Sequence, residues 1–149
     1  LTEIVVSKYQ DKMQQKRLDF DINIQSDLYI EAQEGYMEKV LHNLLDNAIK
    51  YTPEDGKINL ELNRSSGKAV LHLQDTGIGF DAETKKHLFE RFYRSNETQV
   101  QSLTGSGLGL SLVQAIVELY GGKINAYSDG PGEGSTFVVE MPLLASPDN

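Results

Sequence analysis

The spacing of apolar residues predicts several helices along the chain. In a helix an apolar residue recurs every three or four positions, so that the apolar side chains share one face. This repeat covers residues 1–16 and 36–51, and residues 82–92 and 108–120 are also predicted to be helical. The segment 108–120 is apolar nearly all round and is followed by Gly121-Gly122, a pattern typical of a buried helix that ends in a glycine C-cap.

Alternating apolar and polar residues predict strands, because successive side chains of a strand point to opposite faces of a sheet. The alternating segments are residues 18–24, 57–64, 68–75, 123–127 and 135–141. A short β-prone run at 28–30 is predicted to pair with the first of these strands, and the turns between the later strands predict antiparallel hairpins. Hairpins without repeated βαβ units favour an α+β fold with helices layered on one face of a sheet. Residues 93–105 are polar and predict a loop, and residues 144–149 predict a tail.

Composition and charge exclude several classes of protein. The 149 residues fit one domain with a packed core, and a hydrophobic share of 39% argues against disorder. A net charge of -8 has the wrong sign for a nucleic-acid binder, so any bound phosphate must be held by local donors. The chain has no cysteine, which excludes disulfides, zinc–thiolate sites and cysteine nucleophiles. No stretch approaches the ~18 apolar residues of a membrane span, and the chain begins without an initiator Met, so we expect a fragment of a longer protein.

A polar edge on the predicted helix 36–51 is the first candidate for chemistry. Asn43, Asn47 and Lys50 fall within roughly 60° of arc beside the apolar stripe. Asn is a poor residue for a helix interior, because its amide competes for backbone hydrogen bonds. The two amides fit a solvent-facing pair as well as they fit a functional edge. In the functional interpretation their oxygens help to hold a hydrated Mg²⁺ while Lys50 meets a phosphate.

Glycine-rich segments form further candidates. At 75–80 the sequence DTGIGF ends a predicted strand, where the glycines allow close backbone approach and the carboxylate can accept from an amine. Taken alone, the segment is better explained as a plain turn that leaves the strand. At 105–110 the sequence GSGLGL precedes a predicted helix, where it fits either an anion site or close packing. The sequence GEGSTF at 132–137 is by itself only a turn. The chain lacks the dinucleotide and P-loop glycine patterns, which excludes those two kinds of phosphate site.

Together and in order, these segments resemble the boxes of the catalytic domains of sensor histidine kinases. The N, G1, F, G2 and G3 boxes correspond to residues 43–51, 75–79, 89–94, 105–109 and 134–136. The likeness covers residues from about 18 to 143. Such domains belong to a wider ATP-binding group that includes gyrase, the Hsp90 chaperones and the MutL repair proteins.

The resemblance implies a fold and a ligand. The fold is an α+β two-layer sandwich, in which a mixed five-stranded sheet carries three helices on one face, as in Bergerat-type ATP-binding domains. ATP would lie between the sheet and the helices, under a mobile lid at about 93–106. Phosphoryl transfer depends mostly on positioning and electrostatic stabilisation, so a metal, a few donors and a closing lid can suffice.

The resemblance also implies roles for individual residues. Asn47 would ligate Mg²⁺, Asp75 would accept from the adenine amino group, and Tyr51 would pack against adenine. The catalytic candidates, which would contact the metal, the phosphates or the γ-phosphoryl group, are Asn43, Lys50, Arg91 and Arg94. The residues expected to bind the nucleotide are Asn43, Asn47, Lys50, Tyr51, Asp75, Gly77, Ile78, Gly79, Phe80, Tyr93, Gly105, Ser106, Gly107, Leu108, Gly109, Leu110 and Thr136.

Some parts implied by the resemblance lie outside this chain. In the family the phosphoacceptor is a histidine followed by an acidic residue on a separate dimerisation domain, and His42, His72 and His87 do not match. Residues 1–17 would then be a linker helix from that domain, and residues 18–143 the catalytic domain. The full-length protein is expected to be a homodimer that acts with a response regulator, with this domain in the cytoplasm and the parent in the cell membrane.

Related functions remain as alternatives. A gyrase-like or chaperone-like ATPase places a Glu where this chain has Asn43, and an amide cannot act as the base that activates water. A nucleotide-sensing module would bind ATP and recruit a partner without phosphoryl transfer. A serine kinase of the anti-sigma type shares the boxes, but the Tyr93-Arg94 ending of the F box favours a histidine kinase.

Overall fold

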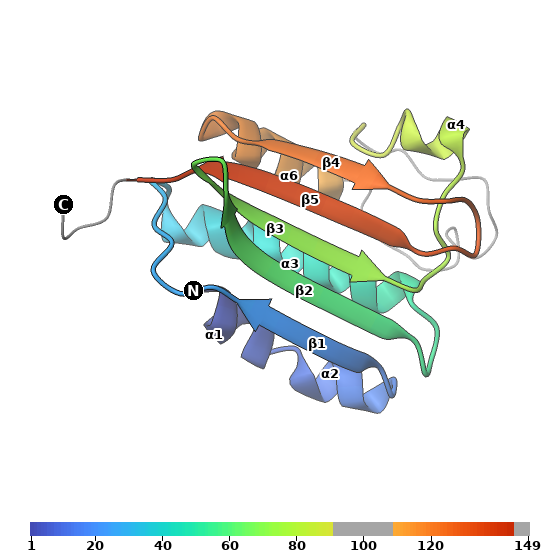
Figure 1. Cartoon of the computed structure of the whole chain (residues 1–149). Coiled ribbons are helices and arrows are strands. Elements are labelled where there is room, and N and C mark those ends of the chain that lie inside the picture. Colours follow the sequence, from blue (N-terminus) through green and yellow to red (C-terminus); the bar gives the residue numbers. More distant parts are fainter. Residues whose placement is uncertain (91–108, 145–149) are drawn as a thin grey trace.

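A five-stranded sheet in the order β1-β2-β3-β5-β4 organises the computed structural model, which describes residues 1–90 and 109–144 (Figure 1). The strands are β1 (Asp19–Ile24), β2 (Lys57–Ser65), β3 (Lys68–Asp75), β4 (Lys123–Tyr127) and β5 (Ser135–Pro142). β1 pairs in parallel with β2, whereas β2–β3, β3–β5 and β4–β5 are antiparallel. The predicted mixed sheet and both predicted hairpins are therefore confirmed.

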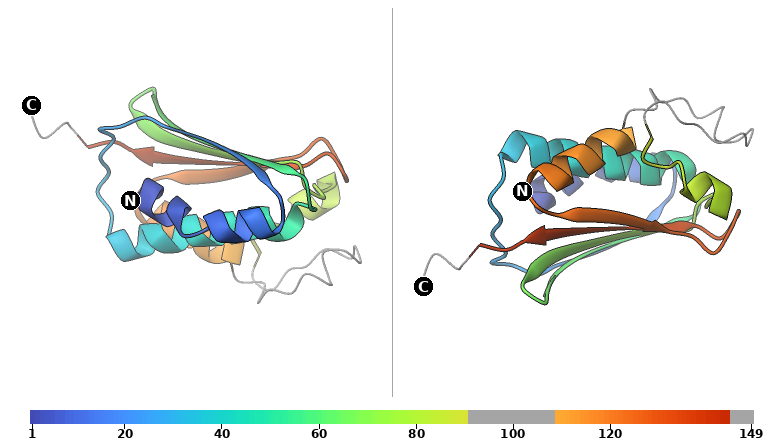
Figure 2. Two further views of the ribbon diagram at one scale, coloured as in Figure 1. Left: turned by 90° about the horizontal axis from the view of Figure 1, so that it is seen from below. Right: turned by 90° about the horizontal axis from the view of Figure 1, so that it is seen from above.

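Helices cover one face of this sheet (Figure 2). The helices are α1 (Thr2–Ser7), α2 (Gln10–Gln15), α3 (Glu34–Tyr51), α4 (Ala82–Lys85) and α6 (Gly109–Leu119). Leu60, Leu73 and Val139 from the sheet are buried in one cluster with Leu45 of α3 and Val117 of α6. Full burial of such a side chain contributes roughly 1.5–3 kcal/mol, so this layer of contacts is the main source of stability. The predicted α+β two-layer fold is confirmed.

The N-terminal segment differs from the single helix predicted for residues 1–16. It forms the two short helices α1 and α2, because the amides of Lys8 and Tyr9 bond to the carbonyls three residues earlier and tighten the turn between them. Val5, Tyr9 and Met13 from the two helices are all buried in the core. The segment is thus packed as part of the domain rather than extended away from it.

The run at 28–30 does not form the predicted strand. β1 instead pairs with β2 from Asp19↔Lys57 to Ile24↔Leu62, and the chain crosses from β1 through α3 to β2. A crossover of this kind makes neighbouring strands parallel. Alternation indicated that residues 18–24 form a strand, but it could not indicate the partner.

The helix predicted at 82–92 is shorter than expected. Asp81 caps α4 by accepting from the Thr84 amide over 2.7 Å, and α4 ends at Lys85. The amides of His87 and Glu90 then bond three residues back, which makes turns rather than a continued α-helix. Residues 91 and 92 lie outside the described part of the chain.

Candidate functional site

Asp75, the last residue of β3, is a buried carboxylate with fixed partners. Its Oδ1 accepts from the Gly77 amide over 2.8 Å and from the Ser135 amide over 3.2 Å, and its Oδ2 accepts from Ser135 Oγ over 2.8 Å. Asp75 is only 6% exposed. Burial raises the pKa of its carboxyl, although the hydrogen bonds from Gly77 and Ser135 act to lower it. A carboxylate has about four acceptor positions and three are used, so Asp75 can accept one more hydrogen bond from a ligand.

The segment 76–80 that follows Asp75 is held against the C-terminal end of α3. The Ile78 amide donates to the Tyr51 carbonyl over 3.0 Å. A Cβ atom on Gly77 would collide with the same carbonyl, so only glycine permits this approach. Phe80 is partly buried against the core. The end of β3 and the end of α3 therefore lie side by side, as the ribbon also shows (Figure 1).

The polar edge of α3 faces the start of α6. Asn43 and Asn47, one helical turn apart, are both half-buried, and Lys50 is exposed. The Asn43 amide nitrogen donates to the Lys39 carbonyl over 2.7 Å, which leaves its oxygen as an acceptor. A Cβ atom on Gly109 would lie 3.0 Å from that oxygen, so α6 begins directly beside Asn43.

This edge suits a magnesium ion that is bound mainly through a ligand. Within residues 1–90 and 109–144, no group of three or more acidic or His side chains is placed to hold a metal. Neutral amide oxygens together with phosphate and water are ligands that Mg²⁺ accepts, since it seldom uses an all-protein cage. The Asn47 side chain makes no hydrogen bond to any of the described residues, so its oxygen is available for such a role.

Comparison with known proteins identifies the group to which this arrangement belongs. The family model described as histidine kinase-, DNA gyrase B-, and HSP90-like ATPase matches residues 32–145. The chain belongs to this family. Within it, the sensor histidine kinase TmoS of Ectopseudomonas mendocina is 38% identical over 97% of this chain, which spans 15% of TmoS.

Solved structures of histidine kinases have the same fold. The catalytic domain of the histidine kinase ThkA matches with a TM-score of 0.82 and 29% identity, over 95% of this chain and 90% of that domain. Full-length ShkA, solved in complex with AMPPNP, matches with a TM-score of 0.81 and 27% identity, over 99% of this chain and 30% of ShkA. ThkA has also been solved in complex with the response regulator protein TrrA, and that ThkA chain matches with a TM-score of 0.77. The chain is thus the ATP-binding catalytic domain of the sensor histidine kinase type.

Several predicted site residues of this histidine kinase domain are brought together. Asn43, Asn47, Lys50 and Tyr51 lie on the C-terminal half of α3, Asp75 to Phe80 lie beside its end, and Gly109 and Leu110 begin α6. The remaining predicted residues are outside the described part of the chain, as is the predicted lid at 93–106. They are Arg91, Tyr93, Arg94, Gly105, Ser106, Gly107 and Leu108.

The hydroxyl that bonds to Asp75 belongs to Ser135, a residue outside the predicted nucleotide-binding set, in which the neighbouring Thr136 was included. Ser135 is the register partner of Asp75, whereas Thr136 pairs with Gln74. Because side chains alternate along β5, Thr136 is on the opposite face from Ser135 and from buried Phe137. The alternation of β5 was available in the sequence, and counting back from Phe137 by two would have indicated Ser135.

Proposed function

We propose that this chain binds Mg-ATP and directs its γ-phosphoryl group to a histidine on a separate dimerisation domain, for two-component signal transduction. The observation that carries the proposal is Asp75, a buried carboxylate with one acceptor position left at the end of β3. The membership of this chain in an ATPase family supports the use of ATP. ShkA, a similar protein, was solved with the ATP analogue AMPPNP.

The free acceptor position of Asp75 selects adenine. Adenine presents an exocyclic amine, which donates, where guanine presents a carbonyl oxygen, which cannot donate to a carboxylate. A ligand that leaves a buried protein group without a hydrogen-bond partner loses far more affinity than one that leaves an exposed group without a partner. Gly77 and Gly79 let the segment 76–80 pack closely against Tyr51 and against the turn 128–134. Ile78, Phe80 and Tyr51 are proposed to pack around the base.

The edge of α3 is proposed to hold the phosphates and the metal. Asn47 would ligate Mg²⁺, Asn43 would face the metal and phosphates, and Lys50 would contact a phosphate as a point charge. When bound, Mg²⁺ neutralises charge on the phosphates and polarises their oxygens. This chain's net charge of -8 repels a polyanion, so local donors and the ion together must offset that repulsion.

The remaining assignments are proposals from the family. Arg91 and Arg94 would stabilise the γ-phosphoryl group, and residues 93–106 would form the lid over the nucleotide. We propose that residues 1–17 connect to the dimerisation domain, and that the full-length protein is a homodimer whose parent chain lies in the cell membrane with this domain in the cytoplasm. The complex of ThkA with TrrA supports a response regulator as the partner. None of the helices in the described residues has the length and apolar content needed to cross a bilayer.

Calorimetric titration of the chain with AMPPNP, with and without Mg²⁺, tests the nucleotide site. We expect binding that is tighter with Mg²⁺, and we expect Asn47→Ala to remove most of that difference. Asn125→Ala, the same change at an exposed position of β4, should leave both affinities unchanged. Absence of binding by a folded sample would contradict the proposal.

Phosphoryl transfer is tested with ATP labelled at the γ-position and a histidine-bearing dimerisation domain supplied in trans. We expect label on the histidine and slow ATP turnover by the chain alone, because Asn43 cannot activate water. Rapid hydrolysis would support a gyrase-like ATPase, and binding without label on any such acceptor would support a sensing module.

A further inference from the structure

Ser128, in the turn between β4 and β5, joins two loops at the edge of the nucleotide site. Its Oγ accepts from the Phe80 amide over 3.1 Å and from the Gly130 amide over 3.2 Å. Its hydroxyl hydrogen goes to the Gly134 carbonyl at 2.7 Å, which is nearer than the Gly130 carbonyl at 3.2 Å. A serine hydroxyl has one donor and two acceptor positions, so this side chain is fully used.

The two loops that Ser128 joins are in direct contact. Gly79 has a φ of +63°, and a Cβ atom there would lie 2.8 Å from Ser128 Oγ and collide with the Gly130 carbonyl. Two backbone bonds run beside this contact, from the Gly132 amide to Ile78 over 2.7 Å and from the Gly134 amide to Gly77 over 3.0 Å. The turn 128–134 therefore packs directly against the segment 76–80.

The Ser128 bond to Phe80 differs from those two bonds because a side chain makes it. It is also the bond that lies farthest along the segment from Asp75. Nearer to Asp75, backbone bonds to Gly77 and Ile78 already hold the chain. Loss of the hydroxyl would leave the Phe80 and Gly130 amides and the Gly134 carbonyl short of a partner in a half-buried place. The segment that carries Gly79 and Phe80 would then be free to move away from the base.

We propose that Ser128 is a positioning residue for adenine recognition, one that sets the place of Gly79 and Phe80 beside Asp75 through its hydroxyl. This inference rests on the proposed function, since it assumes that the base lies against the segment 76–80. All hydrogen-bonding positions of the Ser128 hydroxyl are occupied by protein groups. Its effect on a nucleotide is therefore exerted through the position of the segment 76–80.

The test compares Ser128→Ala with Ser128→Thr, which restores a hydroxyl, in calorimetric titrations with ADP and AMPPNP. We expect Ser128→Ala to weaken both nucleotides by the same factor, about five- to tenfold, with or without Mg²⁺. Ser128→Thr should recover most of the affinity. Protection of the Phe80 amide from hydrogen exchange should fall in Ser128→Ala and return in Ser128→Thr. Ser65→Ala, on the exposed end of β2, is the matched control and should change neither quantity.

Two further variants keep the outcomes distinct. If Ser128→Ala does not fold by circular dichroism, Ser128→Cys, which keeps the shape with a weaker donor, takes its place with the same expectation. Asp75→Asn reports on the site itself, so unchanged ADP affinity in that variant would overturn both proposals. Loss of binding in Asp75→Asn together with wild-type affinity in Ser128→Ala would overturn the role of Ser128 alone. Equal losses in Ser128→Ala and Ser128→Thr, or a loss confined to Mg²⁺-dependent binding, would also overturn it.

Discussion

The Tyr9 hydroxyl lies 2.6 Å from Nδ1 of His42, and this contact joins the N-terminal helices to α3. A second attachment lies at the end of α3, where Lys16 Nζ donates to the carbonyls of Ile49 and Lys50. A cation there satisfies carbonyls that the helix leaves unpaired and complements the helix dipole. The N-terminal helices thus pack along α3, the helix whose polar edge is proposed to hold the phosphates and the metal.

Replacement of Tyr9 by Phe should lower stability without removing nucleotide binding. The variant loses a hydroxyl bond and leaves His42 Nδ1 without that partner, so we expect the free energy of unfolding to fall by about 1 kcal/mol in urea titrations. Tyr29→Phe, at a residue 44% exposed, should change it by less than about 0.5 kcal/mol. Equal effects of the two substitutions would show that the Tyr9–His42 contact contributes nothing.

The ionisation of Tyr9 should also affect stability at alkaline pH. Burial, and then the negative charge of Asp46, raise the pKa of Tyr9 above its usual range. Since the folded-state pKa lies above the unfolded one, the stabilisation is present below about pH 10 and declines as the pH rises further. Absorbance titration above this pH should show a late-ionising tyrosine, and Tyr9→Phe should remove that component. A titration that is the same in both proteins would contradict the assignment.

Asp75→Asn should separate folding from binding. An Asn oxygen can keep both backbone donors that Oδ1 now accepts, and Ser135 can turn its hydroxyl to accept from the new amide nitrogen. That nitrogen would face an adenine amine donor to donor, so affinity should fall about tenfold or more, in line with 1.5–3 kcal/mol for a bond to a charged acceptor. Calorimetry measures the affinity, with exposed Asp21→Asn on β1 as the control.

The same variant should be as stable as the parent chain at neutral pH, or slightly more so. Burial raises the folded-state pKa of Asp75, so keeping it charged opposes folding, and that loss grows as the pH rises from about 3.9 through the raised pKa. Urea unfolding over a series of pH values from about 4 to 8 should show that the variant's relative stability increases with pH. A large loss of stability would mean that the charge itself holds the loop at the end of β3.

Gly109→Ala should weaken Mg²⁺-dependent binding while preserving the fold. The added methyl would lie 3.0 Å from Asn43 Oδ1 and must displace that amide, whereas Ala favours the helix. Gly35→Ala is the control, because nothing lies within 4 Å of a Cβ there, and it should raise stability by up to about 1 kcal/mol without affecting binding. Unchanged Mg²⁺-dependent affinity in folded Gly109→Ala would show that the position of Asn43 is unimportant.

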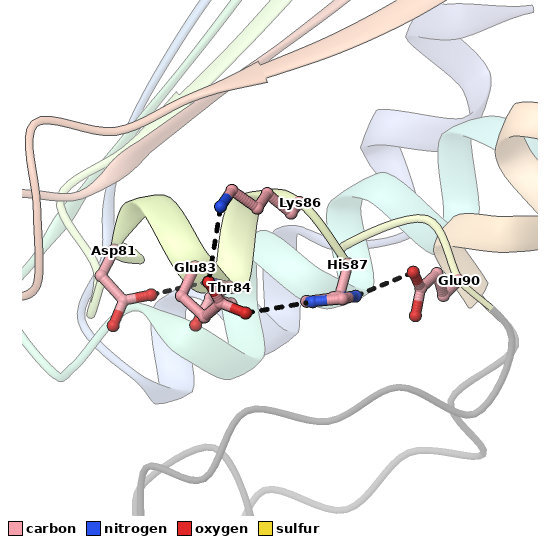
Figure 3. A network of polar contacts seen from close by, with 6 residues as sticks. All are labelled: Asp81, Glu83, Thr84, Lys86, His87 and Glu90. Atoms are coloured by element: carbon pink, nitrogen blue, oxygen red, sulfur yellow. Dashed lines mark hydrogen bonds and ion pairs between the residues drawn. The ribbon is translucent and has the colours of Figure 1, made fainter.

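His87 should titrate above the usual histidine range. Its Nδ1 lies 2.8 Å from Glu90 Oε1 and its Nε2 3.3 Å from Glu83 Oε1 (Figure 3). The hydrogen bond with Glu90, followed by that with Glu83, raises the pKa of His87. The resulting stabilisation is therefore present below about pH 6.5 and lost as the pH rises through the raised pKa. An NMR titration should show that the pKa of His87 is lower in Glu90→Gln than in the parent chain and unchanged in Glu118→Gln. Equal pKa values in the parent chain and both variants would contradict the contact.

The local elements of the fold could be predicted because their signals are local. The apolar repeat of 36–51 and the alternation of 57–64, 68–75, 123–127 and 135–141 correspond to α3 and to four of the strands. A helix or strand buries one face by its own geometry, so the residues to be buried repeat at the period of that element. The end of the helix predicted at 82–92 was wrong, because the chain after Lys85 forms turns with bonds three residues back.

The sequence by itself determined the five strands of the sheet and the helices α3 and α6, and that the glycine-rich segments and the polar edge of α3 occur in the order of a histidine kinase domain. Only the tertiary structure decided that β1 pairs with β2, that Ser135 is the register partner of Asp75, and that Ser128 joins two loops. Periodicity is a property of each segment's own backbone. Pairing, register and loop contacts depend instead on which distant segments pack together, and a shift of one residue moves a side chain to the other face of the sheet.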